Sequence, residues 1–162
     1  MNHAAKPPSA SATSMTEYVL PTHANAMGNV FGGQILAWMD LCAAMCAQRH
    51  CGTIAVTAGI DDLSFEHPVK VGQFVRLEGR VTAAFRSSVE VEVRVSGEDG
   101  STGTIWPCVR AYLTFVAIGP VGAPAVVPPL LAEGPEDEAR RADAEARRRH
   151  RLESRARSAA PG

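Results

Sequence analysis

One apolar segment, residues 31–51, constrains the fold more than any other part of this chain. It reads FGGQILAWMDLCAAMCAQRHC and has no helix-breaking residue after Gly33. At about 3.6 residues per turn its apolar side chains point to all sides, so we predict a long helix that is buried all round. Asp40 lies two turns inside this helix. Because an unpaired carboxylate in a protein interior costs roughly several kcal/mol, Asp40 is a candidate functional residue.

The residues that precede Asp40 strengthen this interpretation. Gly32 and Gly33 let a ligand approach the first free amides of the helix, where the positive end of the helix dipole favours negative charge. Asn25, just upstream, could orient a water molecule or a carbonyl group. A helix amino terminus with a carboxylate about 10 Å further along suits acyl transfer. The alternative is a buried Asp40 whose hydrogen bonds are satisfied by a neighbouring strand.

After the helix, the pattern changes from helical to alternating. Residues 89–95 read VEVEVRV, and the other predicted strands are rich in β-branched and aromatic residues. We predict strands at residues 17–20, 53–65, 74–85, 89–95 and 111–118. Residues 86–88 form a tight connection, which indicates an antiparallel hairpin. The sequence therefore predicts an α+β fold, with one long helix cradled by an antiparallel sheet whose uncovered edges favour self-association.

Composition fits a single compact domain. The chain has 162 residues, is 46% hydrophobic and carries a formal net charge of −1, which argues against nucleic-acid binding. Residues 1–15 are polar and rich in proline and serine, so we expect a flexible arm rather than a secretory signal. No apolar run reaches the length of a membrane span. We expect a cytoplasmic protein that binds neither nucleic acid nor a membrane.

The four cysteines carry no metal-binding pattern. They lack the CxxC spacing and a histidine at ligand spacing, which predicts buried, reduced thiols and no metal. These residues are Cys42, Cys46, Cys51 and Cys108.

Four segments, taken in order, resemble one enzyme family. They are NAMGNVFGGQILAWMD, TAGIDDLSFEHPVKVGQFV, FRSSVEVEV and AYLTFVAI. Over residues 16–119 the chain resembles the acyl-CoA thioesterases of the hotdog superfamily, in the branch of the bacterial YciA-type enzymes and the brain acyl-CoA hydrolases. The resemblance implies a hotdog fold that dimerises into a continuous sheet, and hydrolysis of acyl-CoA to free CoA and a carboxylic acid.

The resemblance also implies roles for the residues around the helix. Asp40 matches the catalytic aspartate, which acts either as general base or as nucleophile. Asn25 matches an asparagine that helps to position water or the thioester and comes from the other subunit of a dimer. Amides near Gly32 and Gly33 would polarise the thioester carbonyl.

A second group of residues matches the part of the family that binds coenzyme A. Arg86, Ser87 and Ser88 correspond to a turn that meets the CoA phosphates, although a polar hairpin turn would read the same. No cofactor is implied, because CoA is part of the substrate. The expected assembly is a homodimer and, beyond it, a trimer of dimers. Two other functions remain open: a non-catalytic acyl-CoA sensor, and a CoA hydratase, which would need an Asp and His pair.

Beyond residue 119 the composition changes. Residues 120–135 are rich in proline, alanine and glycine and predict a linker without regular structure. Residues 136–162 are dense in charge, with acids early and arginines later, and predict a solvated helix or a disordered tail. A basic patch for RNA, a membrane or CoA phosphates is the functional alternative. Because the tail lacks an apolar stripe, we expect a chain ending at Pro120 to form a folded, active oligomer.

Overall fold

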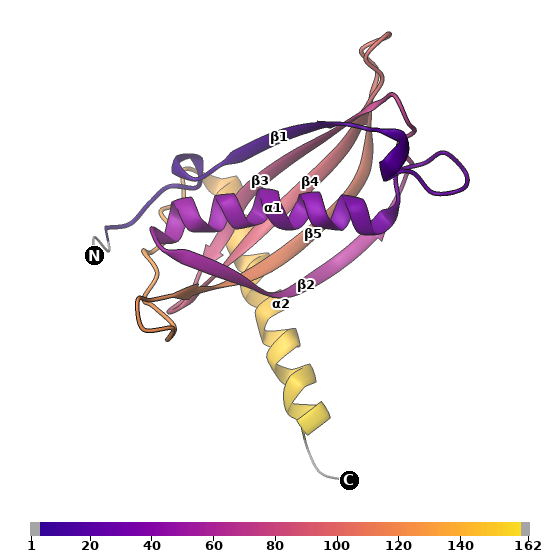
Figure 1. Cartoon of the computed structure of the whole chain (residues 1–162). Coiled ribbons are helices and arrows are strands. Elements are labelled where there is room, and N and C mark those ends of the chain that lie inside the picture. The colour runs from indigo at the N-terminus through magenta and orange to yellow at the C-terminus, as the bar shows by residue number, and fades with distance from the viewer. Residues whose placement is uncertain (1–3, 160–162) are drawn as a thin grey trace.

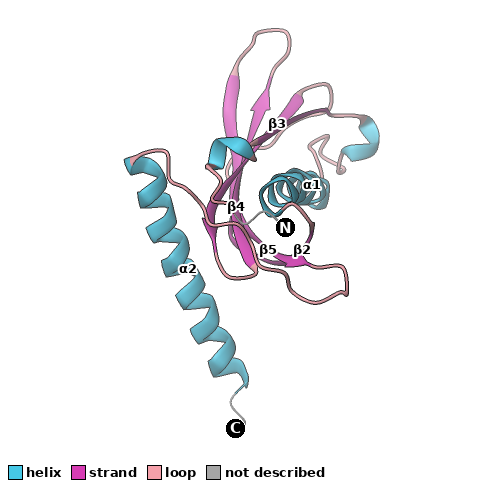
Figure 2. Ribbon diagram, turned by 90° about the vertical axis from the view of Figure 1, so that its left-hand side faces the viewer, coloured by secondary structure: helices cyan, strands magenta, loops and turns pink. Residues whose placement is uncertain are grey.

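A long helix lies in the concave face of a five-stranded antiparallel sheet, and a second helix lies against the opposite face (Figures 1 and 2). The computed structural model describes residues 4–159. Its main elements are β1 (Thr13–Tyr18), α1 (Gly32–Cys51), β2 (Ile54–Phe65), β3 (Phe74–Ala84), β4 (Ser88–Glu98), β5 (Ile105–Ile118) and α2 (Pro135–Ala159), with short 3-10 helices at Pro8–Ala10 and Pro21–His23. The predicted α+β architecture and the order of a strand, a helix and four strands are confirmed.

The strand order shows which strand forms an edge of the sheet and where the β3–β4 turn lies. The order is β1-β3-β4-β5-β2, so β2 is an edge strand. β3 and β4 form the expected hairpin, and Phe85 donates its amide hydrogen to the carbonyl of Ser88 at its turn (2.8 Å). Ser88 is paired with Val116, and Ile54 with Ile118. The β3–β4 turn therefore lies at the end of the sheet where α1 ends and β2 begins.

The core lies between α1 and the concave face of the sheet. The buried α1 residues are Ile35, Trp38, Met39, Cys42, Ala43, Cys46, Ala47, His50 and Cys51. The prediction that α1 is buried on all sides is wrong for a single chain. Leu41 is 55% exposed and Met45 38% exposed, because the sheet covers only one side of the helix. This leaves an apolar stripe of α1 that no other described residue covers.

The expected flexible arm is packed against the domain from Lys6 onward. The Lys6 ammonium donates to the carbonyls of Arg49 and His50, at the negatively polarised end of α1. Ser11 and Thr13 are buried, and β1 begins at Thr13 rather than at residue 17. Short polar side chains fit here because they hydrogen-bond to nearby backbone, as Ser11 does to Pro8. Residues 1–3 of the predicted arm lie outside the described residues.

The charged tail forms the predicted helix and most of its side chains are exposed, but this helix is docked on the domain. Residues 120–134 are largely irregular, as expected, but Val127 is buried and donates its amide hydrogen to the carbonyl of Arg86. α2 then packs on the outer face of the sheet, and its carboxyl-terminal end extends past the sheet (Figures 1 and 2). It is attached chiefly by ion pairs rather than by an apolar stripe: Arg80 with Asp137, Arg147 with Glu90, and Arg151 with Asp61. Residues 160–162 lie outside the described part. No helix among the described residues is long and apolar enough to cross a membrane.

Candidate active site

Asp40 lies half-buried on α1 and faces β2. The hydroxyl of Thr57, on β2, donates to Oδ1 of Asp40 at 2.6 Å. The β2–β5 register shifts between Thr57 and Gly59, and such bulges often redirect side chains beside active sites. Among the described residues Asp40 has no other hydrogen-bond partner. One carboxylate oxygen is therefore held in place, as the alternative of a strand-satisfied Asp40 requires, while Oδ2 remains available to a substrate or water.

The amino terminus of α1 offers unpaired amides. Phe31 is the N-cap, and its side chain caps no backbone group. Within the described part of the chain, the amides of Gly32 and Gly33 have no hydrogen-bond acceptor. A Cβ at Gly33 would lie 2.6 Å from the exposed Phe31 ring, so a larger residue there would require this ring to move. The ring of Phe65 lies over Gly32, where a Cβ would be 3.5 Å away. These amides can bind a developing oxyanion.

Asn25 lies in the loop before α1, close to this helix terminus. Its Oδ1 accepts the backbone amides of Met27 (3.0 Å) and Asn29 (3.3 Å), which fixes the loop. The side-chain oxygen is therefore occupied, and the Nδ2 amide is the end that can act on a ligand, as a donor to an oxygen. Asn25 and Gly32 line one cavity of about 300 Å³, together with apolar side chains such as Ile35 and Phe65.

The expected site residues are not gathered in one cluster within a single chain. Asp40 does not line the cavity of Asn25 and Gly32, since it lies two turns, about 12 Å, further along α1. Arg86, at the β3–β4 turn, lies at the opposite end of the sheet from that cavity. Arg86 is exposed and has no carboxylate partner among residues 4–159. Within one chain, these expected site residues therefore do not form a single site.

The cysteines are free and buried, as predicted. Burial raises the pKa of the Cys46 thiol to about 12 and that of Cys108 to about 11. Cys108 lines the cavity of Asn25 and Gly32, but its high pKa keeps it protonated near neutral pH, so it is not a nucleophile.

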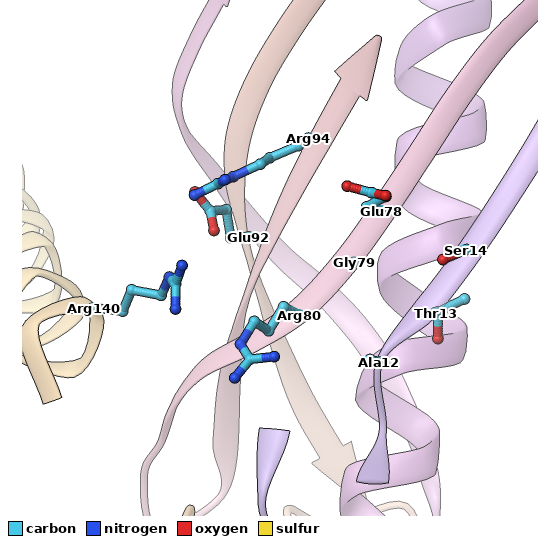
Figure 3. A pocket seen from close by; sticks show the side chains of 9 residues that line it. All are labelled: Ala12, Thr13, Ser14, Glu78, Gly79, Arg80, Glu92, Arg94 and Arg140. Atoms are coloured by element: carbon cyan, nitrogen blue, oxygen red, sulfur yellow. The ribbon is translucent and has the colours of Figure 1, made fainter. Parts of the chain in front are cut away.

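Another cavity, of about 260 Å³, lies between the outer face of the sheet and the start of α2 (Figure 3). Arg80 from β3, Arg94 from β4 and Arg140 from α2 line it. Asp137 pairs with Arg80 and Arg140, and Glu92 pairs with Arg94. Because carboxylates of the chain itself already compensate these charges, we assign no ligand to this cavity.

In sequence, the chain is similar to known thioesterases. The thioesterase superfamily matches residues 27–104. The chain is 43% identical over 103 residues to acyl-coenzyme A thioesterase 11 of Mus musculus, a match covering 64% of this chain and 17% of that protein. It is 32% identical over 133 residues to the cytosolic acyl coenzyme A thioester hydrolase of Homo sapiens, covering 81% of this chain and 35% of that protein. The chain thus spans 17% and 35% of the lengths of these two relatives.

The structural similarity extends over almost the whole chain. A hexameric acyl-CoA thioesterase superposes with a TM-score of 0.90 at 35% identity, covering 98% of this chain and 99% of that one. The acyl-CoA hydrolase of Staphylococcus aureus, solved with butyryl coenzyme A and coenzyme A, gives a TM-score of 0.87 at 31% identity, covering 94% and 93%. The chain belongs to the thioesterase superfamily and has its hotdog fold.

The Staphylococcus aureus hydrolase also draws attention to Thr57. Its structure has been solved with an asparagine, an aspartate and a threonine each replaced by alanine. The intervals between those three positions equal the intervals between Asn25, Asp40 and Thr57. Sequence reasoning identified the first two and missed Thr57, because a single strand threonine is common and only its contact with Asp40 sets it apart.

Proposed function

We propose that this protein is an acyl-CoA thioesterase that hydrolyses acyl-CoA to free CoA and a carboxylic acid. The observation that carries the proposal is the contact between Thr57 and Asp40. It holds a carboxylate on the exposed side of a helix whose first amides are unpaired. Membership of the thioesterase superfamily supports the same reaction.

The chemistry follows from the two oxygens of Asp40. With Oδ1 held by Thr57, Oδ2 either takes a proton from the attacking water or attacks the thioester carbonyl itself. In both routes the carbonyl oxygen becomes negative. It is stabilised by the amides of Gly32 and Gly33 of a second subunit, since Gly32 of the same helix lies about 12 Å from Asp40. The C–S bond then breaks, the thiolate of CoA takes up a proton, and water supplies the new oxygen of the acid. Asn25 donates from Nδ2 to the thioester oxygen or to the water.

The complete site is proposed to form between two subunits. β2 is an unpaired edge that exposes Ile54, Val56, Ile60, Leu63 and Phe65, and it lies next to the exposed stripe of α1. Antiparallel pairing of two β2 edges about a twofold axis would extend the sheet and cover this apolar surface. It would also bring the Asn25 end of one subunit beside the β3–β4 turn of the other. A trimer of such dimers would match the hexameric relative.

The two alternatives lead to different measurements. An acyl-CoA sensor would bind acyl-CoA without releasing CoA. A hydratase would need a histidine paired with the aspartate, whereas among the described residues the carboxylate of Asp40 is hydrogen-bonded only to Thr57. We also propose a cytoplasmic location, in line with the cytosolic human relative.

The test is the release of free CoA thiol from acyl-CoA. Asp40→Asn should lower kcat at least about a hundredfold while acyl-CoA binding changes little. Thr57→Val should lower kcat about tenfold or more, and Thr57→Ser, which keeps the hydroxyl, should restore most of it. Wild-type protein that binds acyl-CoA without multiple turnovers would contradict the proposal, as would Asp40→Asn with kcat within a few-fold of wild type.

A further inference from the structure

The two halves of α2 differ in charge and in how their charges are paired. In the first half, Arg140 and Arg141 pair with acids of the same helix. From residue 147 onward the helix carries six arginines and one acid, Glu153. Arg147 and Arg151 pair with carboxylates of the sheet. The other four, Arg148, Arg149, Arg155 and Arg157, have no carboxylate partner among the described residues.

Arg148 lies beside the β3–β4 turn. Its guanidinium carbon is 4.6 Å from the centroid of the Phe85 ring, and Phe85 directly precedes Arg86 in the turn. The preceding residue, Arg147, fixes the position of α2 at this point. Arg147 donates two hydrogen bonds to buried Glu90 and stacks on Tyr112 at 3.6 Å. Arg148 is thus held at the turn by a neighbour that cannot shift without losing a buried ion pair.

The side chains of the turn support the same location. Successive residues of a strand point to opposite faces, so Ser88 faces the same side of the sheet as Glu90, which is the side covered by α2. Ser88, Phe85 and Arg148 therefore share one face at this end of the sheet. Arg86 is at the tip of the same turn and is exposed and unpaired. The turn and the helix beside it thus carry two guanidinium groups without a carboxylate partner among the described residues, one of them on the Phe85 ring, and a serine hydroxyl.

We infer that the turn of α2 around Arg148 is a second wall of the CoA site, with Arg148 binding a phosphate group of the CoA nucleotide. This inference rests on the proposed function. The diphosphate and the ribose phosphate of CoA together carry more than two negative charges at neutral pH, more than Arg86 alone can compensate. A guanidinium that stacks on an aromatic ring keeps its N–H edge available for a phosphate. α2 lies outside residues 27–104, so the superfamily match does not include this wall.

The experiment measures the binding of free CoA to the full-length protein by calorimetry, so that it needs no turnover. Arg148→Gln should raise the Kd for CoA about tenfold, as expected for loss of a charge-assisted hydrogen bond. Arg148→Lys, which keeps the charge but not the planar group, should give a smaller rise. Arg157→Gln is the matched control, because it removes the same charge from the last turn of α2, and it should change Kd less than twofold.

Truncated ligands show which part of CoA the arginine recognises. The effect of Arg148→Gln should vanish with acyl-pantetheine, measured as kcat/KM. If the effect persists with dephospho-CoA, which lacks the ribose phosphate, Arg148 binds the diphosphate. If the effect is lost with dephospho-CoA, Arg148 binds the ribose phosphate. An equal effect on acyl-pantetheine would overturn the inference, as would a Kd within twofold of wild type. If the wild type binds CoA with this pattern but never turns over acyl-CoA, the proposed reaction fails and the phosphate site stands.

Discussion

The ion pair between Arg147 and Glu90 allows a stability prediction for the attachment of α2. Glu90 is fully buried on the outer face of β4, and the Arg147 side chain is 17% exposed. Arg147 binds both carboxylate oxygens, Oε1 at 2.7 Å and Oε2 at 3.2 Å, and the hydroxyl of Thr82 also donates to Oε1. The variant Arg147→Met keeps the apolar stem over the sheet. It leaves the charge of Glu90 buried beneath α2 without its cation.

The expected loss follows from that burial. Removing one partner of a buried ion pair costs about 3–5 kcal/mol, and we expect the lower end, about 3 kcal/mol, because Arg147 retains some contact with water. Replacing both charges, in Arg147→Met with Glu90→Gln, should recover most of this loss, since no buried charge then remains and Thr82 keeps a hydrogen-bond partner. Arg141→Met is the matched control on the same helix. Its ion pairs are half-exposed, and we expect a loss of about 0.5 kcal/mol or less.

The measurement is urea unfolding followed by circular dichroism, with all variants at one protomer concentration because an oligomer is expected. Equal losses for Arg147→Met and Arg141→Met would refute the reasoning, since Glu90 would then reach water without its partner. A double variant no more stable than Arg147→Met alone would also contradict it. In that case the arginine would act through its stacking on Tyr112 rather than through the charge.

Three further predictions concern other parts of the molecule. A chain ending at Pro120 should melt at least about 4–8 °C lower than the full chain. A loss of only about 2 kcal/mol of packing by α2 and the linker has this effect in a domain of this size. An unchanged Tm would mean that the tail is dispensable, as the sequence predicts. Co-refolding the Asn25→Ala and Asp40→Asn variants should recover about a quarter of wild-type turnover. Half of the randomly paired dimers are mixed, and each mixed dimer carries one intact site of two. Mixed dimers that are identified by mass spectrometry and are inactive would mean that both residues act within one chain. Burial lowers the pKa of His50 below its ordinary value of 6.5. The contribution of His50 to stability is therefore present above about pH 6.5 and is lost as the pH falls through the folded-state pKa. In urea unfolding, His50→Gln should make stability depend less on pH below about 6.5.

The local features of the fold could be predicted from the sequence. The run from Phe31 to Cys51 contains one helix, Gly32–Cys51, and the alternating VEVEVRV segment lies in a strand of the predicted hairpin. Periodicity is a property of neighbouring residues, so it survives in any compact fold. The same holds for the pair of glycines at the helix start, whose amides are unpaired as expected. Asp40 stands out in the sequence because a carboxylate in an apolar helix is unusual wherever the helix packs.

Contacts between distant segments could not be predicted. Thr57 and Asp40 belong to different elements, and nothing in the sequence around either residue predicts their contact. The packing of the two chain ends could not be predicted for the same reason. Lys6 binds the carboxyl-terminal end of α1, and α2 attaches through Arg147 and Glu90, 57 residues apart.

The C-terminal helix shows most clearly what the sequence determined and what only the tertiary structure decided. Its charge pattern and good helix formers determined that residues 135–159 form a helix, because those preferences act within a few turns. The pattern did not determine whether that helix is solvated or docked, since any of several arginines could pair with water or with a distant carboxylate. Only the folded sheet, which places Glu90 and Asp61 on the surface that α2 crosses, selects the partners. A buried ion pair depends on three-dimensional distance and desolvation, and neither is encoded in local spacing.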